Sequence, residues 1–483
     1  MFLLCHGVAL VLLTGVACTE NVDYKFDIPL LRSAYPVWDT VPISGKSGVG
    51  DPLILTPFIE SKELGKARDL ALVKNLPGLS ESDDIESYSG FFTVDEEHNS
   101  NLYFWFFPSM TKNENDPVLL WLQGGPGASS LYGLFEEIGP FSVTTDMKLK
   151  LNKHSWHRNH SLIFIDNPVG TGFSFTDTEE GYCENQEKVG EHLYSALTQF
   201  YSIFENYKSA PFYITGESYA GKFIPTLAHT IHKKNSNNPD FKINLQGVAI
   251  GNGFTDPKTM LHYSDFVYQL GLVDSHYRDA MAVAEKESVE ALKNNNTIKA
   301  YNGWAETLLL FAHGSHFHNL YNFLSPKNKP LEDFFAVYLQ TPEVRRVLHV
   351  GDLEFTSIGK VYLKMIPDFM NSVQPTVEEV INNYRVLFYS GQMDIIVAYP
   401  LSVNLFENLM HSGSDEYRNA TRNAWMVDNE LAGYIKQAGN FTEVLVRNAG
   451  HMVPADQPEW AYKLISDFAL NQLKSSSDDE FII

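Results

Sequence analysis

The chain of 483 residues carries 36 basic and 59 acidic residues, a formal net charge of −23, and 44% of its residues are apolar. A chain of this length and apolar content can bury a large core. The acidic balance argues against nucleic acid or an anionic membrane surface as the partner, because both require a basic surface. The excess of carboxylates also fits an acidic compartment, where protonation lowers their mutual repulsion.

The N-terminus has the pattern of an export sequence. An apolar run, Val8–Val16, is followed by small residues up to Cys18 and by a polar stretch from Thr19. This order predicts a secretory signal peptide at residues 1–18, although no Lys or Arg precedes the run. The alternative is an N-terminal membrane anchor, for which the run is short. No later segment approaches a membrane-spanning length, so we expect no stable membrane insertion.

Glycosylation sequons support the secretory route. Four Asn-x-Ser/Thr sequences occur behind the apolar run, and each marks a glycan acceptor in an exported protein. The chain ends Asp-Glu-Phe-Ile-Ile, which is not a retention sequence of the KDEL type. We therefore expect a secreted or a lysosomal (vacuolar) protein. The four acceptors are Asn159, Asn295, Asn419 and Asn440.

Only three cysteines are present, which is unusual for an exported chain. Cys5 and Cys18 fall within the expected signal peptide, so the mature chain has a single thiol and no intramolecular disulfide. Its stability must then come from core burial. Cys183 is either a buried inert thiol or free to pair between chains. The sequence leaves open whether two chains form a homodimer.

Strand-like and helix-like segments alternate after residue 86. Residues 19–86 form a polar lead-in with a helical stretch near Ser61–Lys74. Several later runs are apolar throughout, as in strands buried on both faces, and helices are expected at Glu187–Phe204 and Tyr219–Lys233. This alternation predicts an α/β protein with a mostly parallel central sheet flanked by helices. The expected strands are Tyr88–Val94, Leu102–Phe107, Val118–Leu122, Leu162–Asp166, Phe212–Thr215, Ile243–Ile250, Val386–Tyr389 and Glu443–Val446.

The strand pattern stops between Pro257 and about Pro342. The segment is helical in character, most clearly at Asp274–Lys293, and it precedes the last strands. An insertion at this place predicts a helical cap over the carboxyl edge of the sheet. The expected divisions are the signal peptide 1–18, the N-terminal lead-in 19–86, the first part of the core 87–257, the helical cap insertion 258–342, the second part of the core 343–474 and an acidic tail 475–483.

The first chemical motif is Thr215-Gly216-Glu217-Ser218-Tyr219-Ala220-Gly221, which follows a short strand and opens a helix. A serine on such a turn projects its hydroxyl away from the sheet, and the turn needs small residues two positions to either side. Gly216 and Ala220 supply them. Because Ala220 replaces the second glycine of the strict pattern, the motif alone is also compatible with a chance Gly-x-Ser turn.

Two further residues fall where a serine nucleophile needs them. Asp394 follows the strand Val386–Tyr389, and His451 follows the strand Glu443–Val446. The chain order Ser, Asp, His is that of the α/β-hydrolase fold, and parallel sheets place their sites beyond the carboxyl ends of strands. The sequence therefore predicts Ser218 as the nucleophile, His451 as the general base and Asp394 as the acid that orients His451.

A serine hydrolase also requires backbone N–H donors for the oxyanion. Tyr219, directly after the nucleophile, supplies one. The second is expected from the glycine-rich loop Trp121–Gly127, where glycines allow the backbone to approach a substrate oxygen. A plain turn is the alternative interpretation of this loop.

Four motifs together resemble the signatures of serine carboxypeptidases, and within that family the vitellogenic carboxypeptidase-like group. The resemblance runs from about Leu76 to Trp460 and implies release of single residues from peptide or protein C-termini, usually at acidic pH. It further implies that Gly125 and Tyr219 form the oxyanion hole, and that Gln123, Gly124 and Glu217, with Glu137 paired to Glu217, bind the substrate's terminal carboxylate. The motifs are Gln123-Gly124-Gly125-Pro126-Gly127, Gly216-Glu217-Ser218-Tyr219-Ala220-Gly221, Gly251-Asn252-Gly253 and Gly450-His451-Met452-Val453-Pro454.

The role implied for Glu217 has a physical basis. An ionised Glu217 would repel both the oxyanion and a substrate carboxylate. Two glutamates close together in a poorly solvated site cannot both ionise at low cost, so the pair with Glu137 should hold a proton. A protonated Glu217 can donate a hydrogen bond to the terminal carboxylate, which predicts activity in the acid range. The alternative is that Glu217 merely faces solvent at the turn.

Two positions depart from the family pattern. Gln123 stands where the family usually carries Asn, so the amide donor is kept with a longer reach. Ala128 stands where many members have a disulfide cysteine, in agreement with the cysteine count.

His313, His316 and His318 in the expected cap lack an accompanying Cys or acidic motif, and the chain has no His-Glu-x-x-His. We therefore expect neither a metal site nor a cofactor.

Three function classes remain open. The first is an active serine carboxypeptidase. The second is an acyltransferase or esterase on the same site, because an acyl-enzyme can pass to acceptors other than water. The third is a catalytically silent binding or yolk-storage protein. The set Ser218, Asp394 and His451 weighs against the third class, and Gln123 with Glu217 weighs against the second.

Overall fold

The computed structural model describes residues 48–80, 85–238, 241–317, 319–325, 334–356 and 358–473. The expected signal peptide, the lead-in up to residue 47 and the acidic tail lie outside these residues. Within the described ranges, no helix is both long and apolar enough to cross a lipid bilayer.

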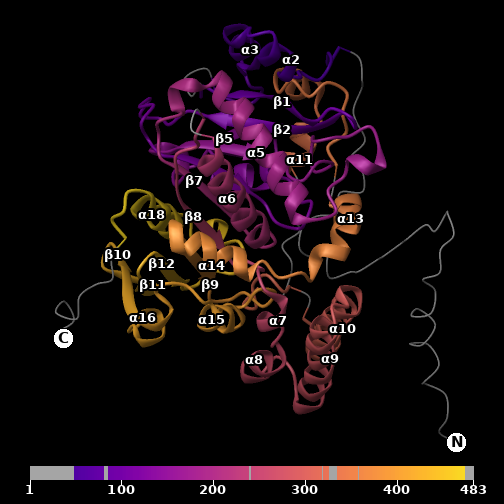
Figure 1. The fold of residues 1–483 in the computed structure, drawn as a ribbon, viewed down its shortest axis with the longest axis vertical. Helices are drawn as coiled ribbons and strands as arrows, with labels where there is room; N and C mark the ends of the chain where they lie inside the picture. The colour runs from indigo at the N-terminus through magenta and orange to yellow at the C-terminus, as the bar shows by residue number, and fades with distance from the viewer. Residues whose placement is uncertain are drawn as a thin grey trace, which may run out of the picture.

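A ten-stranded sheet forms the centre of the fold, with the order β1-β2-β6-β3-β7-β8-β9-β12-β11-β10 (Figure 1). The strands from β6 to β12 in this order run parallel to one another. Antiparallel strands complete both edges. The bounds are β1 (Tyr88–Asp95), β2 (Ser100–Phe107), β3 (Val118–Leu122), β6 (Ser161–Ile165), β7 (Phe212–Glu217), β8 (Leu245–Gly251), β9 (Arg385–Gly391), β10 (Asn423–Val427), β11 (Glu430–Ala438) and β12 (Phe441–Val446); β4 (Phe141–Val143) and β5 (Leu149–Leu151) pair separately.

Both faces of the sheet are covered, because neighbouring residues of a strand point to opposite faces. On β7, Ile214 packs with residues of α5 and α6, whereas Tyr213 packs with residues of α18. Helix α5 begins directly after Asn185, whose side chain accepts a hydrogen bond from the N–H of Lys188. The helices around the sheet are α2 (Thr56–Glu60), α3 (Leu64–Ala71), α5 (Gln186–Ile203), α6 (Ala220–Asn237), α14 (Gln374–Asn383), α15 (Tyr399–Asn408), α16 (Ser414–Asn419), α17 (Val453–Asp456) and α18 (Pro458–Ala469).

All the strands expected from the sequence are present, and the mostly parallel α/β architecture is confirmed. The hairpin β10–β11 was not expected. Its strands are only partly buried and include Gly433 and several polar residues, so they lack the continuous apolar runs of the central strands.

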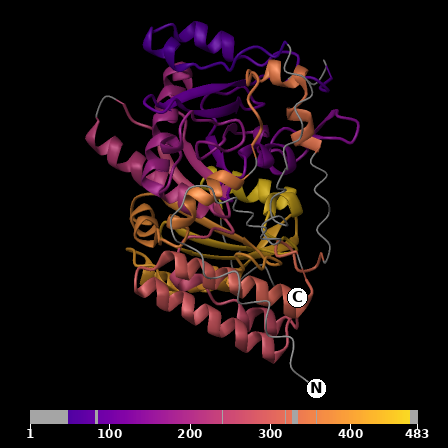
Figure 2. The same cartoon turned by 90° about the vertical axis from the view of Figure 1, so that its right-hand side faces the viewer.

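The region between β8 and β9 contains helices and, among the residues the structure describes there, no strand of the sheet. Helices α9 and α10 lie side by side at one end of the molecule (Figures 1 and 2). Asp274 accepts a hydrogen bond from the N–H of Tyr277 and so caps α9. The bounds are α7 (Pro257–Met260), α8 (Ser264–Gln269), α9 (Ser275–Lys293), α10 (Thr297–Ser315), α11 (Phe334–Leu339), α12 (Pro342–Val347) and α13 (Gly359–Phe369).

Helix α11, within the range 258–342, packs against the segment after β3 and the lead-in. Phe335 of α11 stacks on Phe135 with ring centroids 5.7 Å apart. Tyr338 of the same helix donates a hydrogen bond to the carbonyl oxygen of Pro77. Helices α8–α10 extend away from the sheet but still contribute buried side chains, among them Val267, Met281 and Trp304, to the core cluster that includes Ile214.

Candidate active site

Ser218 occupies the sharp turn between β7 and α6, with a φ of 64°. A non-glycine residue in this region costs on the order of 1–3 kcal/mol unless its surroundings hold it there. Three backbone hydrogen bonds of 2.9 Å do so: the Ser218 N–H donates to the carbonyl of Gly251, and the Ser218 carbonyl accepts from the N–H groups of Gly221 and Phe254. The turn is therefore fixed by β8 and by the segment after it.

The need for small residues in this turn is visible in the contacts. A Cβ at Gly216 would lie 2.1 Å from the carbonyl oxygen of Leu122, and a Cβ at Gly221 would lie 2.8 Å from Gly253. The methyl group of the fully buried Ala220 fits here, 3.2 Å from the Cβ position of Gly216. The motif thus tolerates Ala220 because the strict requirement falls on Gly216 and Gly221.

Asp394 and His451 lie together beyond the carboxyl ends of β9 and β12. His451 Nδ1 is 2.8 Å from Asp394 Oδ2, and both side chains are fully buried. Asn252 Nδ2 donates to the same oxygen at 2.7 Å, and the N–H of Val397 donates to Oδ1 at 3.3 Å. The carboxylate of Asp394 is thereby held in one orientation toward the imidazole.

The other nitrogen of His451, Nε2, is buried and has no hydrogen-bond partner in the described structure. A general base needs this free position for the proton of the nucleophile. No hydrogen bond joins Nε2 to Ser218 among the described residues, as is common for such pairs without substrate. The structure thus brings Asp394 and His451 into contact and leaves the base atom open.

Two residues that support this pair were not assigned a role from the sequence. Asn252 lies in the motif Gly251-Asn252-Gly253, which carried the family resemblance but no stated function. Tyr321 accepts a hydrogen bond of 2.7 Å from the N–H of His451 through its carbonyl, and its ring lies edge-on to the imidazole with centroids 4.8 Å apart. No pattern around Tyr321 indicated this contact.

The glycine-rich loop lies directly against the nucleophile turn. A Cβ at Gly124 would meet Ser218 Cβ at 2.6 Å and the backbone nitrogen of Tyr219 at 2.7 Å. Gly125 has a φ of 108°, which a residue with a side chain rarely adopts. Within the described ranges, neither the N–H of Gly125 nor that of Tyr219 donates a hydrogen bond. Two unused backbone donors therefore stand beside Ser218.

Glu217 points into a buried polar cluster rather than to solvent. Gln123 Nε2 donates to Glu217 Oε1 at 2.7 Å and to Glu137 Oε1 at 3.4 Å. The indole of Trp121 donates to Gln123 Oε1 at 2.7 Å, which fixes the amide orientation. Glu217 is fully buried and Glu137 is 4% exposed. The alternative in which Glu217 faces solvent is therefore wrong.

Burial is the main cause of altered acidity in this pair. It raises the pKa of Glu137 to about 8. Burial, reinforced by the adjacent charge of Glu137, raises the pKa of Glu217 well above its ordinary value. Since neither carboxyl ionises readily and each opposes ionisation of the other, the pair retains a proton at acidic and neutral pH.

The remaining residues named from the sequence lie apart from this site. Among the acceptor asparagines, Asn295, Asn419 and Asn440 are exposed and Asn159 is half-buried. His313 and His316 lie in and after α10, and His318 is outside the described residues. Within the described part of the chain, no group of His, Cys, Asp or Glu side chains could hold a metal ion.

Cys183 is buried beside His192, with Sγ 3.5 Å from the ring nitrogen Nδ1. Burial raises the pKa of the thiol to about 12. The thiolate is the reactive form of cysteine, so Cys183 has the environment of an inert core thiol.

A family model described as serine carboxypeptidase matches residues 77–471. The chain belongs to the serine carboxypeptidase family. Vitellogenic carboxypeptidase from Aedes aegypti is 46% identical over 96% of this chain and 98% of the relative. Venom serine carboxypeptidase from Apis mellifera is 43% identical over 93% of this chain and 98% of its own length. A probable serine carboxypeptidase, CPVL, from Homo sapiens is 43% identical over 91% and 93%.

A solved structure supports the same assignment. The crystal structure of Kex1, a prohormone-processing carboxypeptidase from Saccharomyces cerevisiae, has a TM-score of 0.72 and 25% sequence identity, and it covers 85% of this chain and 96% of its own. The α/β-hydrolase fold expected from the sequence is confirmed, and the chain is a serine-type carboxypeptidase.

Proposed function

We propose that this carboxypeptidase releases C-terminal residues from peptides through an acyl-enzyme on Ser218 and favours acidic pH. The observation that carries the proposal is the buried, proton-holding pair of Glu217 and Glu137, which lies one residue from the nucleophile. A protonated carboxyl group at this position can donate a hydrogen bond to the free C-terminus of a peptide.

Acylation begins when Ser218 Oγ attacks the carbonyl carbon of the last peptide bond. His451 accepts the hydroxyl proton at Nε2, the nitrogen that has no other partner. Asp394 keeps the imidazole in position and stabilises the imidazolium that forms. The N–H groups of Gly125 and Tyr219 donate to the oxyanion of the tetrahedral intermediate.

Collapse of the intermediate releases the C-terminal amino acid. His451 returns its proton to the leaving amine, and the acyl group stays on Ser218. A water molecule then gives a proton to His451 and attacks the ester. His451 returns this proton to Ser218 Oγ as the Oγ–acyl bond breaks, which frees the shortened peptide and restores the enzyme. In both acylation and deacylation the proton moves to or from His451 Nε2. Its partner is Ser218 Oγ, the nitrogen of the leaving amine or the oxygen of the water molecule.

The terminal carboxylate of the substrate is recognised by donors. A protonated Glu217, the side-chain amide of Gln123 and the N–H of Gly124 would provide them, and Glu137 would keep the proton on Glu217. When both carboxyl groups are protonated, the pair is neutral. As the pH rises and the pair loses the first of its two protons, a negative charge faces the substrate carboxylate. Affinity for peptides should therefore fall toward alkaline pH.

A blocked dipeptide with a free or an amidated C-terminus, assayed at pH about 5, tests the proposal. Cleavage of the free acid alone supports it, and loss of that cleavage in Ser218→Ala supports the assignment of the nucleophile. Equal cleavage of both substrates would instead favour the esterase or acyltransferase alternative. Cleavage of neither by the folded protein would favour a silent binding or yolk-type role.

We propose a secretory route as well, leading to a secreted or lysosomal enzyme. Support comes from the apolar N-terminal run and from the exposed positions of Asn295, Asn419 and Asn440. Glycans on these three residues and on Asn159 should be removed by an endoglycosidase with a measurable loss of mass. Helices α7–α10 would act as the cap over the site, within the range 258–342.

A further inference from the structure

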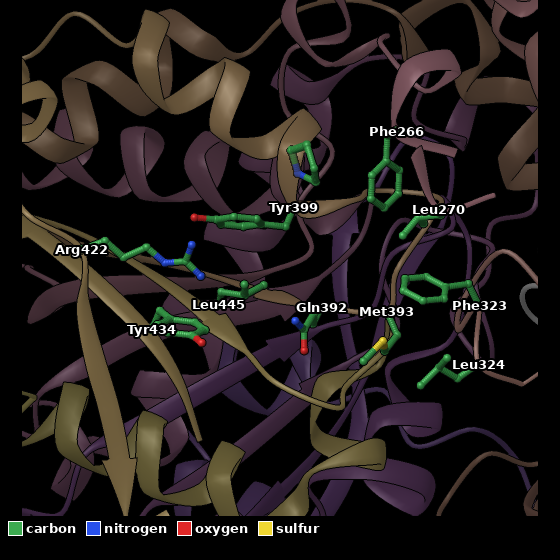
Figure 3. Close-up of a pocket in the computed structure, with 11 residues that line it drawn as sticks. Phe266, Leu270, Phe323, Leu324, Gln392, Met393, Tyr399, Arg422, Tyr434 and Leu445 are labelled. Carbon is green, nitrogen blue, oxygen red and sulfur yellow. The ribbon is translucent and has the colours of Figure 1, made fainter. Parts of the chain in front are cut away.

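A cavity lies beside the loop that bears Asp394, but Ser218, Asp394 and His451 are not among its lining residues. Its volume is about 730 Å³ (Figure 3). It is formed where α8 meets the loop after β9, the start of α15 and the outer strands β10–β12. Ligand pockets commonly have volumes of about 300–1,000 Å³, so this cavity is large enough for a ligand of its own.

One end of the cavity is apolar. Phe266 and Leu270 come from α8, and Phe323 and Leu324 from the segment after α10; these four gather on one side of the view in Figure 3. Leu270 is 39% exposed and Leu324 is 65% exposed. Large aliphatic side chains in an open hollow leave apolar surface for a ligand to cover.

The opposite end carries a single cation, Arg422. Its guanidinium lies 4.1 Å from the ring centroid of Tyr434 and 5.5 Å from that of Tyr399. Arg422 forms no hydrogen bond or ion pair with any residue that the structure describes. By contrast Arg418, on the neighbouring helix α16, donates to Asp415 at 2.9 Å. In a chain with a net charge of −23, a guanidinium without a carboxylate partner is available to an added anion.

One of the two rings beside Arg422, that of Tyr399, is held by a hydrogen bond. The hydroxyl of Tyr399 donates a short hydrogen bond to the carboxylate of Glu443, and Tyr417 donates to the same carboxylate. Glu443 is only 4% exposed and is already engaged by these two hydroxyls. The guanidinium therefore lies against one fixed ring, which lowers the entropy lost when it binds a ligand.

The wall between the two ends is also preformed. The N–H of Phe323 donates to the carbonyl of Met393 at 2.9 Å, and the N–H of Gln392 donates to the carbonyl of Val446 at 3.0 Å. The side chain of Gln392 lies between the apolar end and Arg422 in Figure 3. Its exposed amide can pair with a polar group in the middle of an elongated ligand.

We propose that this cavity is a binding site for an apolar carboxylate. The carboxylate pairs with Arg422 between Tyr399 and Tyr434, and the apolar body covers Phe266, Leu270 and Phe323. A single guanidinium matches one negative charge and opposes a cationic ligand. The same chemistry is offered by a free aliphatic acid and by an acidic side chain within an apolar peptide. The proposal does not depend on the reaction proposed for Ser218.

Isothermal titration of the full chain with octanoate at pH about 6 tests the site, because the acid is then ionised. Octanamide is the neutral control. Arg422→Gln should weaken octanoate binding about tenfold, or about 1.4 kcal/mol, because the carboxylate loses its charged hydrogen-bond partner. Arg418→Gln, which removes a cation near the cavity but outside its lining, should leave the affinity unchanged.

Octanoate can also enter the substrate site, and the two arginine variants separate these events. Binding that is lost in Arg422→Gln and kept in Arg418→Gln belongs to the cavity. Leu270→Asp should weaken octanoate as well, because it places a negative charge at the apolar end. No saturable binding, or equal affinities of the parent and Arg422→Gln, would overturn the proposal.

The source of the carboxylate is distinguished with a peptide blocked at both ends, acetyl-Leu-Phe-Glu-amide, and its Gln counterpart. Neither is a substrate, because neither has a free C-terminal carboxylate. Tighter binding of the Glu peptide than of octanoate, lost in Arg422→Gln, assigns the site to acidic peptides. The reverse order assigns it to free aliphatic acids.

Discussion

Gln123 donates a hydrogen bond of 2.7 Å to Glu217, although 94 positions separate them in the chain. The same amide approaches Glu137, so one side chain holds two carboxyl groups that burial prevents from ionising together. This cluster joins the glycine-rich loop to the nucleophile turn. We propose that it also recognises a terminal carboxylate and makes peptide cleavage depend on pH.

Replacing Glu217 and Glu137 together by Gln should flatten the acidic preference for peptides. Burial raises the pKa of Glu137 to about 8, so the parent pair is most fully protonated below that pH and gains charge above it. The kcat/KM of the parent for peptides should therefore fall as the pH rises through this range. In the double variant both carboxyl groups are replaced by amides, which do not ionise, so its kcat/KM should not show this fall. The measurement is kcat/KM from pH about 4 to 9.

An ester substrate without a free carboxylate is the control for that experiment. Its hydrolysis does not use the carboxylate-binding donors, so its rate and pH profile should be nearly the same in parent and variant. An unchanged peptide profile in the double variant would contradict the role assigned to the pair.

Asn252→Gly should lower kcat about tenfold while leaving KM close to the parent value. The melting temperature should fall as well, because the buried Asn252 side chain also accepts a hydrogen bond of 3.1 Å from the N–H of Gly391. The asparagine amide donates to the carboxylate of Asp394, and a hydrogen bond to a charged group contributes about 1.5–3 kcal/mol. Glycine suits the φ of 41° at this position, so the backbone is retained. A loss confined to KM would show that Asn252 shapes substrate binding and does not position Asp394.

The central strands could be predicted from the sequence because they are apolar throughout. Val118–Leu122 is buried at every position and its bounds agree with β3. The edge hairpin β10–β11 is half-buried, with polar residues at many positions, so no single periodicity marks it. A strand can therefore be predicted from the sequence when all its residues are buried. It is missed when buried, half-buried and exposed residues follow one another without a regular period.

The same difference applies to the candidate site. Ser218, Asp394 and His451 were found because each follows a strand and their order is restricted by the fold. Tyr321 was not found, since its contact with His451 depends on how a loop beyond α10 returns to β12. The environment of Arg422 was hidden for the same reason: Tyr399 and Tyr434 approach it only in three dimensions.

Lys222→Met should change stability in a pH-dependent way. Lys222 is fully buried, and its Nζ donates to the carbonyls of Phe369, at 2.7 Å, and Asn371. Burial lowers the pKa of this amine to about 7, against the opposing influence of Asp368 and Asp256. Between pH 7 and the unfolded value of about 10.4, the unfolded chain binds more protons.

The parent should therefore gain free energy of unfolding relative to Lys222→Met as pH rises above 7. Urea unfolding at pH about 6 and about 9 measures this difference. Lys222→Arg is the matched control, because a guanidinium stays protonated and should show no such gain. A constant difference between parent and Lys222→Met would contradict the proton release assigned to Lys222.

Tyr263→Phe should loosen the contact between the helices after β8 and the loop that bears Asp394. The Tyr263 hydroxyl donates to the carbonyl of Ile396 at 2.9 Å and accepts from the indole of Trp304 at 3.1 Å. Phenylalanine keeps the ring but leaves a buried donor and an acceptor unpaired, at a cost of about 1–3 kcal/mol. Because Ile396 is two residues from Asp394, kcat should fall together with the free energy of unfolding, measured by urea denaturation. Tyr268→Phe, at an exposed position of α8, the helix that begins directly after Tyr263, is the control and should change neither quantity. A stability loss with unchanged kcat would show that Tyr263 anchors the helices without orienting the loop.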